Sequence, residues 1–362
     1  MITTVTTTKP DRVGKSQAMN RRLFYVITAI SVAVTVYMVS RNLDKLPDER
    51  TTAYRNYIKE LPGKQADVKG SHRRLDSGTE DQQTLDHEVF DGVQTFLMFI
   101  GYPRSGHTLI SSLLDAHPNA IVANEFEVIR EWKNWETTNK NKYFLFDQLY
   151  QNSKQEAEIG YRSATVRHRY NYAVPGQWQG KFNSKILVIG SKKGGMTTKL
   201  LVKSENMKAL KQLQQHLGIS FKFLHVVRNP YDNIATMLLR SLHKREDADF
   251  GEKLNEPKHL DQEIRKYFRL AEINSRLKSY LPGQVYEIHS SEMIQNPQET
   301  LLGICQFLDL TCDQKYLEDC SKIVYHKATK TRYNLVWTET QKDLVRQQMQ
   351  EFPFLKDYRF GD

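Results

Sequence analysis

The segment from Phe96 to Glu125, FLMFIGYPRSGHTLISSLLDAHPNAIVANE, constrains the fold of this chain more than any other. It begins as an apolar run typical of a buried strand, passes through a loop bracketed by Gly101 and Gly106, and continues as a helix that opens at His107. Such a loop directs several backbone N–H groups into one concavity at a helix N-terminus, where they bind a phosphate or a sulfate. The segment therefore predicts a site for a phosphorylated nucleotide.

The loop has almost the spacing of a Walker A motif, GxxxxGK[ST], but His107 stands where that motif has lysine. A second pattern, LHVVRNPYDNIATMLLR, ends a predicted strand in Arg228. A nucleoside triphosphatase would end this strand in an aspartate that holds magnesium. Thr236 would lie about two turns into the next helix, where its hydroxyl can bond the same anion as Arg228. These features argue against ordinary magnesium–ATP chemistry.

Five short apolar runs alternate with segments of helical periodicity. This alternation is typical of an α/β fold with a central parallel sheet and helices on both faces, whose ligands bind at the carboxyl ends of the strands. A helix predicted at 197–217 ends at Gly218, and Asn229–Pro230 marks the start of another. The strands are predicted at residues 95–100, 120–123, 185–189, 221–227 and 285–289.

The motifs PRSG-x-T-L and LDAHP resemble the 5′-phosphosulfate-binding loop and first helix of the sulfotransferase family. Within that family they look most like the membrane-bound tyrosylprotein sulfotransferase and related Golgi branches. The resemblance covers roughly residues 95–360 and implies a P-loop-containing sulfotransferase-like fold. It also implies that the donor is PAPS (3′-phosphoadenosine 5′-phosphosulfate). The residues implied to hold the 5′-phosphosulfate are Arg104, Ser105, Gly106, His107 and Thr108.

The same resemblance assigns roles to four further residues. Arg228 and Thr236 match the arginine and serine that bind the donor 3′-phosphate, with threonine in place of serine. Lys192 matches a strand-end lysine that contacts the transferring sulfate. Glu125 lies at the same offset from Pro118 as the catalytic glutamate of the tyrosylprotein branch. The resemblance thus places a carboxylate base beside two anion-binding sites.

Several positions depart from the family pattern. His107 replaces the usual threonine, and either donates a ring N–H to the donor phosphate or acts as a second base. Ser290 and Ser291 stand where the family usually has tyrosine and glutamate, and Ser290 is expected to reach the adenosine or a phosphate. Lys330 and Arg332 belong to a late basic loop that the resemblance places over the 3′-phosphate.

The chain has 362 residues, a net charge of +10 and a pI of about 9.2, which suits an anionic donor and an acidic acceptor. We expect no nucleic-acid partner, because the sequence contains no zinc-finger spacing, RNP-like run or arginine-rich tract. The three cysteines, Cys305, Cys312 and Cys320, do not suggest a metal site. An oxidising lumen would permit a Cys312–Cys320 bridge, with Cys305 buried as a small apolar side chain.

An uncharged, mostly apolar run at residues 23–40 is long enough to cross a bilayer. We therefore expect a tail at 1–22, a transmembrane signal-anchor at 23–40, a stem at 41–92 and a sulfotransferase domain at 93–362. Lysine and arginine are balanced on the two sides of the run, so charge does not decide the orientation. The resemblance implies a cytosolic N-terminus and a luminal domain in the Golgi membrane, that is, a single-pass type II protein.

The sequence therefore predicts an enzyme that transfers a sulfuryl group from PAPS to a hydroxyl of a glycan or of a tyrosine in an acidic peptide. Glu125 would take the acceptor proton, Arg104 and Lys192 would neutralise charge on the leaving group, and no metal would be needed. Two alternatives stay open: a P-loop kinase or NTPase with a degenerate loop, and a catalytically inactive binding protein. The oligomeric state, including a homodimer, also stays open.

Overall fold

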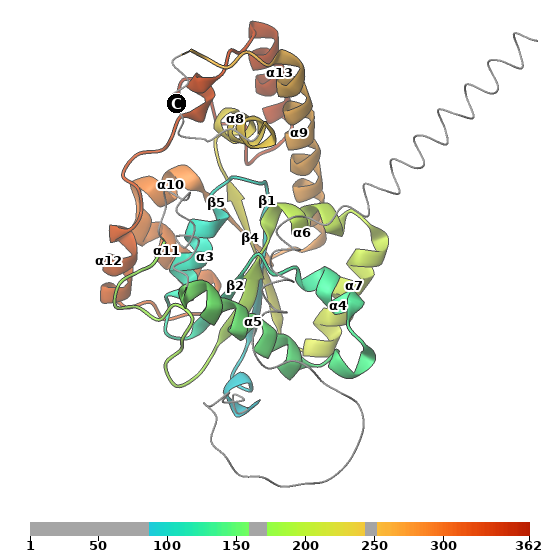
Figure 1. The fold of residues 1–362 in the computed structure, drawn as a ribbon, viewed down its shortest axis with the longest axis vertical. Helices are drawn as coiled ribbons and strands as arrows, with labels where there is room; N and C mark the ends of the chain where they lie inside the picture. Colours follow the sequence, from blue (N-terminus) through green and yellow to red (C-terminus); the bar gives the residue numbers. More distant parts are fainter. Residues whose placement is uncertain (1–86, 159–171, 243–251) are drawn as a thin grey trace, which may run out of the picture. The chain divides into compact units, whose positions relative to one another are not determined.

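The computed structural model describes residues 87–158, 172–242 and 252–362 (Figure 1). All of them belong to one compact unit, Gln82–Asp362. The predicted tail, the predicted membrane segment at 23–40 and most of the predicted stem lie outside these residues. Within the three described ranges, no helix is both long and apolar enough to cross a membrane.

The described strands form one parallel sheet in the order β2-β3-β1-β4-β5, with β1 at its centre. Every residue of β1, β2 and β3 is buried, as expected for parallel strands that helices cover on both faces. The strands are β1 Thr95–Gly101, β2 Ala120–Asn124, β3 Val188–Lys192, β4 Ser220–Val227 and β5 Val285–His289.

The predicted strand boundaries are correct to within one residue except in β3. The sequence predicted this strand at 185–189, but it runs from Val188 to Lys192. Lys192 is therefore the last residue of a strand and pairs in register with Asn124 of β2. The predicted run at 185–189 includes the approach to the sheet, where the N–H of Leu187 donates to the carbonyl of Asn119 and its carbonyl accepts from Gln94 and Thr95 at the start of β1.

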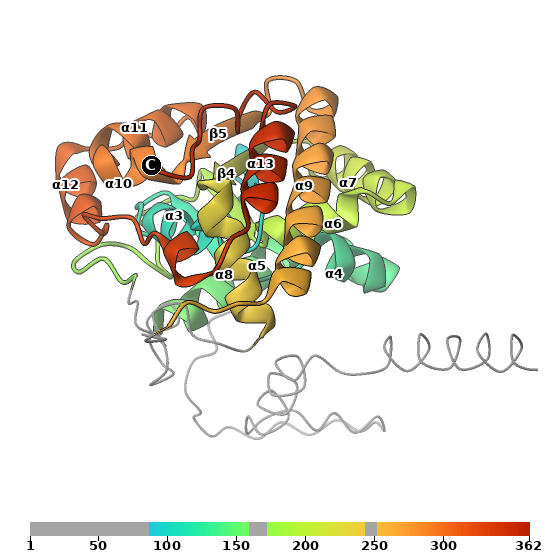
Figure 2. The ribbon, with the colours of Figure 1, turned by 90° about the horizontal axis from the view of Figure 1, so that it is seen from above.

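Alternate residues of the strands face two separate apolar cores, as the two-residue period of a strand requires. Phe96, Met98 and Ile100 of β1 face one core, and Leu97 and Phe99 face the other. Figure 2 shows α4, α6 and α7 on the opposite side of the strands from α3, α11 and α12. The helices of the first face are α4 Val128–Asn134, α5 Lys142–Glu158, α6 Gly194–Leu201 and α7 Ser204–Leu217; those of the second are α3 His107–Asp115, α10 Ser290–Gln295, α11 Pro297–Phe307 and α12 Gln314–Lys322.

A third apolar cluster packs at the carboxyl end of the sheet and includes Tyr102 and Val227, the residues at the ends of β1 and β4. It is built by α8 Pro230–Ser241, α9 Pro257–Tyr280 and α13 Glu339–Met349 (Figure 1). Two short 3₁₀ segments, η1 His87–Phe90 and η3 Thr331–Asn334, border α5 and α8 respectively. A further 3₁₀ turn, η2 Thr137–Asn139, separates α4 from α5.

The local signals for helix ends are confirmed, with one correction. Gly218 ends α7 in the left-handed region at φ 63°, and Asn229 caps α8 by accepting a hydrogen bond from the backbone N–H of Tyr231. The single helix predicted at 197–217 is two helices, α6 and α7, because the chain turns at Val202 and Lys203. The apolar periodicity continues through this turn, so periodicity alone does not reveal it.

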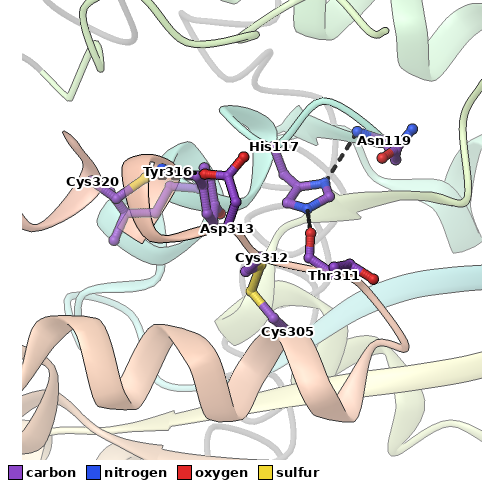
Figure 3. Close-up of a disulfide and its surroundings, with 9 residues drawn as sticks. His117, Asn119, Cys305, Thr311, Cys312, Asp313, Tyr316 and Cys320 are labelled. Atoms are coloured by element: carbon purple, nitrogen blue, oxygen red, sulfur yellow. Dashed lines mark hydrogen bonds between the residues drawn. A yellow bond between two sulfur atoms is a disulfide. The ribbon is translucent and has the colours of Figure 1, made fainter. Parts of the chain in front are cut away.

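The Cys312–Cys320 bridge that an oxidising lumen would permit is not formed, and Cys305 is not a free apolar side chain. Cys305 of α11 and Cys312 of the following loop form the disulfide, with 6.2 Å between their Cα atoms (Figure 3). Cys320 is a buried free thiol on α12 and is directed toward the backbone oxygen of Leu113 in α3. The bridge closes the short loop between α11 and α12. The carbonyl of Thr311 in that loop accepts a hydrogen bond of 3.1 Å from Nε2 of His117.

Candidate active site

The loops that carry the predicted site residues meet at the carboxyl edge of the sheet. Gly101 at the end of β1 is in register with Val226 of β4, so the loop after β1 and Arg228 are neighbours. From β1 the chain proceeds to β2 on one side, and from β4 it proceeds to β5 on the other. Ligands of open α/β sheets bind at such a reversal of strand order.

The loop between β1 and α3 is held in an unusual backbone conformation. Gly101, Arg104 and Gly106 all have positive φ angles, of 138°, 70° and 103°. An added Cβ at Gly101 would lie 2.9 Å from Nε2 of His107, so a side chain there is excluded by contact as well as by backbone strain. Left-handed residues inside such a loop turn successive N–H groups toward one side, which creates an anion-binding concavity.

His107 is buried below this loop rather than directed out of it. Its side chain is enclosed and its Nε2–H donates to the carbonyl of Ile100 at 3.1 Å. Oγ of Ser105 lies 3.3 Å from Nδ1 of the same ring. Burial, together with the positive charge of Lys192, lowers the pKa of His107 to about 3. The ring is therefore neutral at physiological pH, and its geometry fits a support for the loop better than a base that faces substrate.

Lys192 connects the loop to Glu125. Its side chain is almost completely buried, and its Nζ donates to Oγ1 of Thr108 at 3.1 Å and to the carboxylate of Glu125. Glu125 follows β2 directly, so the register of β2 and β3 brings the carboxylate to the lysine. The side chain of Glu125 is 46% exposed, which leaves it accessible from solvent while it contacts a buried cation.

The backbone around Glu125 is also specialised. Glu125 has a φ of 58°, a left-handed conformation that is uncommon outside glycine and costs free energy. Its N–H donates to the carbonyl of Lys192 at 2.9 Å, and Nζ of Lys193 donates to its carbonyl at 3.1 Å. The neighbouring Glu127 is buried and paired with Arg130 at 2.8 Å. Of these two carboxylates, only that of Glu125 is both exposed and paired with Lys192.

Arg228 and Thr236 are brought together as the sequence predicted. Nη1 of Arg228 donates to Oγ1 of Thr236 at 3.2 Å and to the carbonyl of Arg104 at 3.3 Å. Nη2 of Arg228 donates to the carbonyl of Thr329 at 2.7 Å and to Oγ1 of Thr331 at 3.2 Å. The guanidinium thus links the phosphate-binding loop, α8 and the late basic loop. The sequence did not point to Thr329 or Thr331.

Residues 97–314, more than half of the chain, match the model of the Sulfotransferase family. The chain belongs to the sulfotransferase family. A Caenorhabditis briggsae protein named "Putative protein-tyrosine sulfotransferase" is 25% identical over 227 residues, which cover 61% of this sulfotransferase and 68% of that relative.

Solved structures with a similar arrangement include two sulfotransferases. A mouse sulfotransferase complexed with PAP is 14% identical, with 75% of this chain and 89% of that chain covered and a TM-score of 0.40. A Mycobacterium avium sulfotransferase is 12% identical, with 75% and 80% covered and a TM-score of 0.40.

The late loop of this sulfotransferase differs from the sequence-based expectation at Arg332. Its guanidinium is 1% exposed and forms an ion pair with Asp232 of α8 at 2.8 Å. It also donates to the backbone oxygen of Asp362. Arg332 therefore fixes the C-terminus and η3 against α8, and we correct its assignment from a donor-binding residue to a structural one. The neighbouring Lys330 is exposed and precedes η3.

Ser290 lies at the same carboxyl edge as Arg228. It is the first residue of α10, directly after His289, which is in register with Val227 of β4. Its side chain is half-buried. This placement puts Ser290 at the same edge as the candidate donor site, and its role stays a prediction.

Proposed function

We propose that this sulfotransferase transfers a sulfuryl group from PAPS to a hydroxyl group of a secretory-pathway acceptor. The observation that carries the proposal is the position of Lys192. Its ammonium group bonds both Thr108, at the start of the anion-binding helix, and Glu125, the candidate base. One buried cation therefore joins the place where the donor would bind to the group that would activate the acceptor.

In this proposal, the backbone N–H groups of the loop and the side chains of Arg104 and Thr108 hold the 5′-phosphosulfate. Ser105 contributes its backbone, because its side chain is fully buried and donates to the carbonyl of Tyr102 at 3.1 Å. Arg228 and Thr236 hold the 3′-phosphate, since their hydrogen-bonded side chains lie at the same edge. PAPS carries both anionic groups on one nucleotide. This matches the two neighbouring sites, the loop and the Arg228–Thr236 pair, which are linked by the hydrogen bond from Arg228 to the carbonyl of Arg104. Lys330 and Ser290 remain peripheral candidates.

The proposed reaction is an in-line displacement at sulfur. The acceptor oxygen forms a bond to sulfur as the bond between sulfur and the bridging phosphate oxygen breaks, and PAP leaves with the electron pair of that bond. The carboxylate of Glu125 takes the acceptor proton. Lys192 shifts from its contact with Glu125 to the developing charge on the leaving oxygen, which the loop N–H groups also stabilise. No group is oxidised or reduced.

We further propose that the acceptor is a glycan or a protein tyrosine and that the catalytic domain is luminal in the Golgi. The tyrosine alternative is supported by the name of the Caenorhabditis briggsae relative. A luminal position is supported by the Cys305–Cys312 disulfide, because such bridges persist in oxidising compartments, and by the apolar run at 23–40. Protection of the domain from added protease in sealed microsomes would test the topology; cleavage without detergent would contradict it.

The first experiment measures the melting temperature of the full-length chain with PAP, with magnesium–ATP and with neither. A ligand at 100 times its Kd adds about 2.7 kcal/mol, which raises the melting temperature by several degrees. Selective stabilisation by PAP is the expected result, followed by transfer of labelled sulfate from PAPS to tyrosine peptides or to glycans. Stabilisation by magnesium–ATP alone, or by neither ligand, would refute the proposed donor.

A further inference from the structure

Buried polar atoms without a hydrogen bond of standard geometry gather next to the candidate donor loop. Nine buried side-chain nitrogen or oxygen atoms of the described residues have no hydrogen bond of standard geometry. Five of these nine belong to only four side chains, which are all fully buried: Tyr102, His225, Tyr267 and Asn274. Proteins rarely leave buried polar atoms unpaired, because each one loses its hydrogen bonds to water. Such a concentration at one place needs a physical explanation.

The four side chains come from three elements and lie against one another. Tyr102 is the first residue of the donor loop, and its ring stacks on that of Tyr267 in α9 with 4.4 Å between centroids. The ring of His225 in β4 lies 5.8 Å from the ring of Tyr102. Burial raises the pKa of Tyr102, and the amide of Asn274 and the hydroxyl of Tyr267 lower it, because both lie close to the hydroxyl of Tyr102. Their polar ends therefore converge.

The orientation of the Asn274 amide is set by its other end. The N–H of Gly101 donates to Oγ1 of Thr198 at 2.9 Å, and this hydroxyl donates to Oδ1 of Asn274 at 2.7 Å. Oδ1 therefore accepts from α6, which leaves Nδ2 as the donor directed away from Thr198. A chain of two hydrogen bonds already connects Asn274 to the first left-handed residue of the donor loop.

His225 supplies the opposite end of the cluster. Burial lowers its pKa, so the ring is neutral and has one N–H and one acceptor nitrogen. Nδ1 lies 3.4 Å from a carboxylate oxygen of Glu287, which is the natural acceptor for its proton. Glu287 is itself held by Lys278 and by His289. Nε2 of His225 is thereby left as an acceptor, and it requires a donor in the buried cluster.

We propose that these side chains form one buried hydrogen-bond network, completed by internal water, that positions the donor loop. It runs from Glu287 through His225 to Tyr102, and from there through Tyr267 and Asn274 to Thr198 and Gly101. A buried water makes about three hydrogen bonds to otherwise unpaired polar groups, which is what the converging ends of Tyr102, Tyr267 and Asn274 provide. The two central tyrosines and Asn274 are positioning residues, not catalytic ones.

The effect of the network on ligand binding rests on the proposed function, in which the loop binds PAPS. Gly101 has a φ of 138°, and the network holds its N–H from α6 and α9 before any ligand binds. A loop held in its binding conformation loses less entropy on binding. Disruption of the network should therefore weaken donor binding, whereas kcat at saturating donor should change little, because neither Lys192 nor Glu125 is touched.

The test compares Tyr267→Phe with Tyr316→Phe in the full-length chain. Tyr316 is the matched control, since it is also fully buried but its hydroxyl donates to the carbonyl of Leu113 at 2.8 Å, outside the network. We expect Tyr267→Phe to lower the melting temperature and to raise both the Kd for PAP and the KM for PAPS on the order of fivefold, the effect of one hydrogen bond. Tyr316→Phe should lower the melting temperature and leave the Kd unchanged.

Three outcomes distinguish the possibilities. If Tyr267→Phe raises the melting temperature or leaves it unchanged, the hydroxyl is simply unpaired and the network is refuted. If both variants shift the Kd equally, the effect is general packing and the positioning role is refuted. If the wild-type protein does not bind PAP, the proposed function is refuted. The melting temperatures, together with a crystallographic search for water beside Nδ2 of Asn274, then still decide whether the hydrogen-bond network exists.

Discussion

Lys192 and Glu125 form an ion pair across the carboxyl ends of two neighbouring strands. Lys192 ends β3 with its side chain 2% exposed, and Glu125 follows β2 with its side chain 46% exposed. The buried ammonium group of Lys192 therefore donates its hydrogen bonds toward the exposed carboxylate of Glu125 and toward Thr108 beside the loop. This arrangement makes the two residues separable by experiment, because one faces the proposed donor and the other the acceptor.

Replacement of Glu125 by glutamine should reduce kcat by about 100-fold or more, because a positioned general base contributes roughly 10²–10⁴. Glutamine keeps the size of the side chain but cannot accept the acceptor proton. Steady-state sulfate transfer and PAP binding are measured side by side. Binding should stay near the wild-type value. Glu136→Gln, an exposed carboxylate at the start of η2, serves as the control; full activity of Glu125→Gln would remove this residue from the base role.

Replacement of Lys192 by methionine should lower kcat by about 100-fold, the typical effect of losing one group that stabilises transition-state charge. Methionine fills the buried volume, so packing is largely retained. Lys193→Met is the matched control, since Lys193 is more exposed and its Nζ lies 3.8 Å from the Glu125 carboxylate. Equal losses in the two variants would mean that both lysines act only through the local charge.

Replacement of Arg228 by alanine should raise the KM for PAPS by at least about tenfold, because charge-assisted hydrogen bonds contribute roughly 1.5–3 kcal/mol each. The guanidinium also joins the donor loop to Thr329 of the late loop, so its loss removes a phosphate contact and a structural link. Arg240→Ala, in the last turn of α8 and exposed, is the control. An unchanged KM would contradict the assignment of the 3′-phosphate site.

Local spacing was sufficient to predict some of the site. Arg228 directly follows β4 and Thr236 lies on α8, the helix that comes next, so their proximity depends only on one strand-to-helix turn. The helix ends at Gly218 and Asn229 are similarly local. For the same reason the loop around Gly106 was predicted as an anion site from its glycines and the helix behind it.

Other features depend on partners that are far apart in the sequence. Thr331 lies 95 residues from Thr236, and no pattern in the basic loop shows that its hydroxyl reaches Thr236. The same loop contains Lys330 and Arg332, which look alike in sequence, yet only Arg332 meets a buried carboxylate and is turned inward. The inward orientation of His107 likewise follows from the carbonyl of Ile100, which a motif cannot reveal.

Replacement of Cys305 by serine should destabilise the domain by about 2–3 kcal/mol, the chain-entropy estimate for the short loop that the bridge closes. Denaturant unfolding with and without reductant measures this. Reductant should destabilise the wild type and have little effect on Cys305→Ser. Cys320→Ala is the control, because Cys320 is a free thiol. A Cys312–Cys320 peptide in a mass-spectrometric disulfide map would contradict the pairing.

The buried His107 predicts a dependence of stability on pH. Its folded-state pKa, about 3, is lower than the ordinary value of 6.5, because burial disfavours the charged ring. The unfolded chain thus binds a proton that the folded chain does not, and the contribution of His107 to stability is present above pH 6.5 and is lost as the pH falls toward 3. The expected slope is about 1.4 kcal/mol for each pH unit in that window.

His107→Gln isolates this contribution, because glutamine is uncharged at every pH and its amide can still donate toward Ile100. The difference in unfolding free energy between wild type and variant, measured from pH 7 to pH 4.5, should change in favour of the variant as the pH falls. Transfer activity of His107→Gln should stay within a few-fold of wild type, since the ring faces the protein interior. A large loss of kcat with unchanged PAP binding would show instead that His107 acts as a base, which its neutral, inward-facing ring argues against.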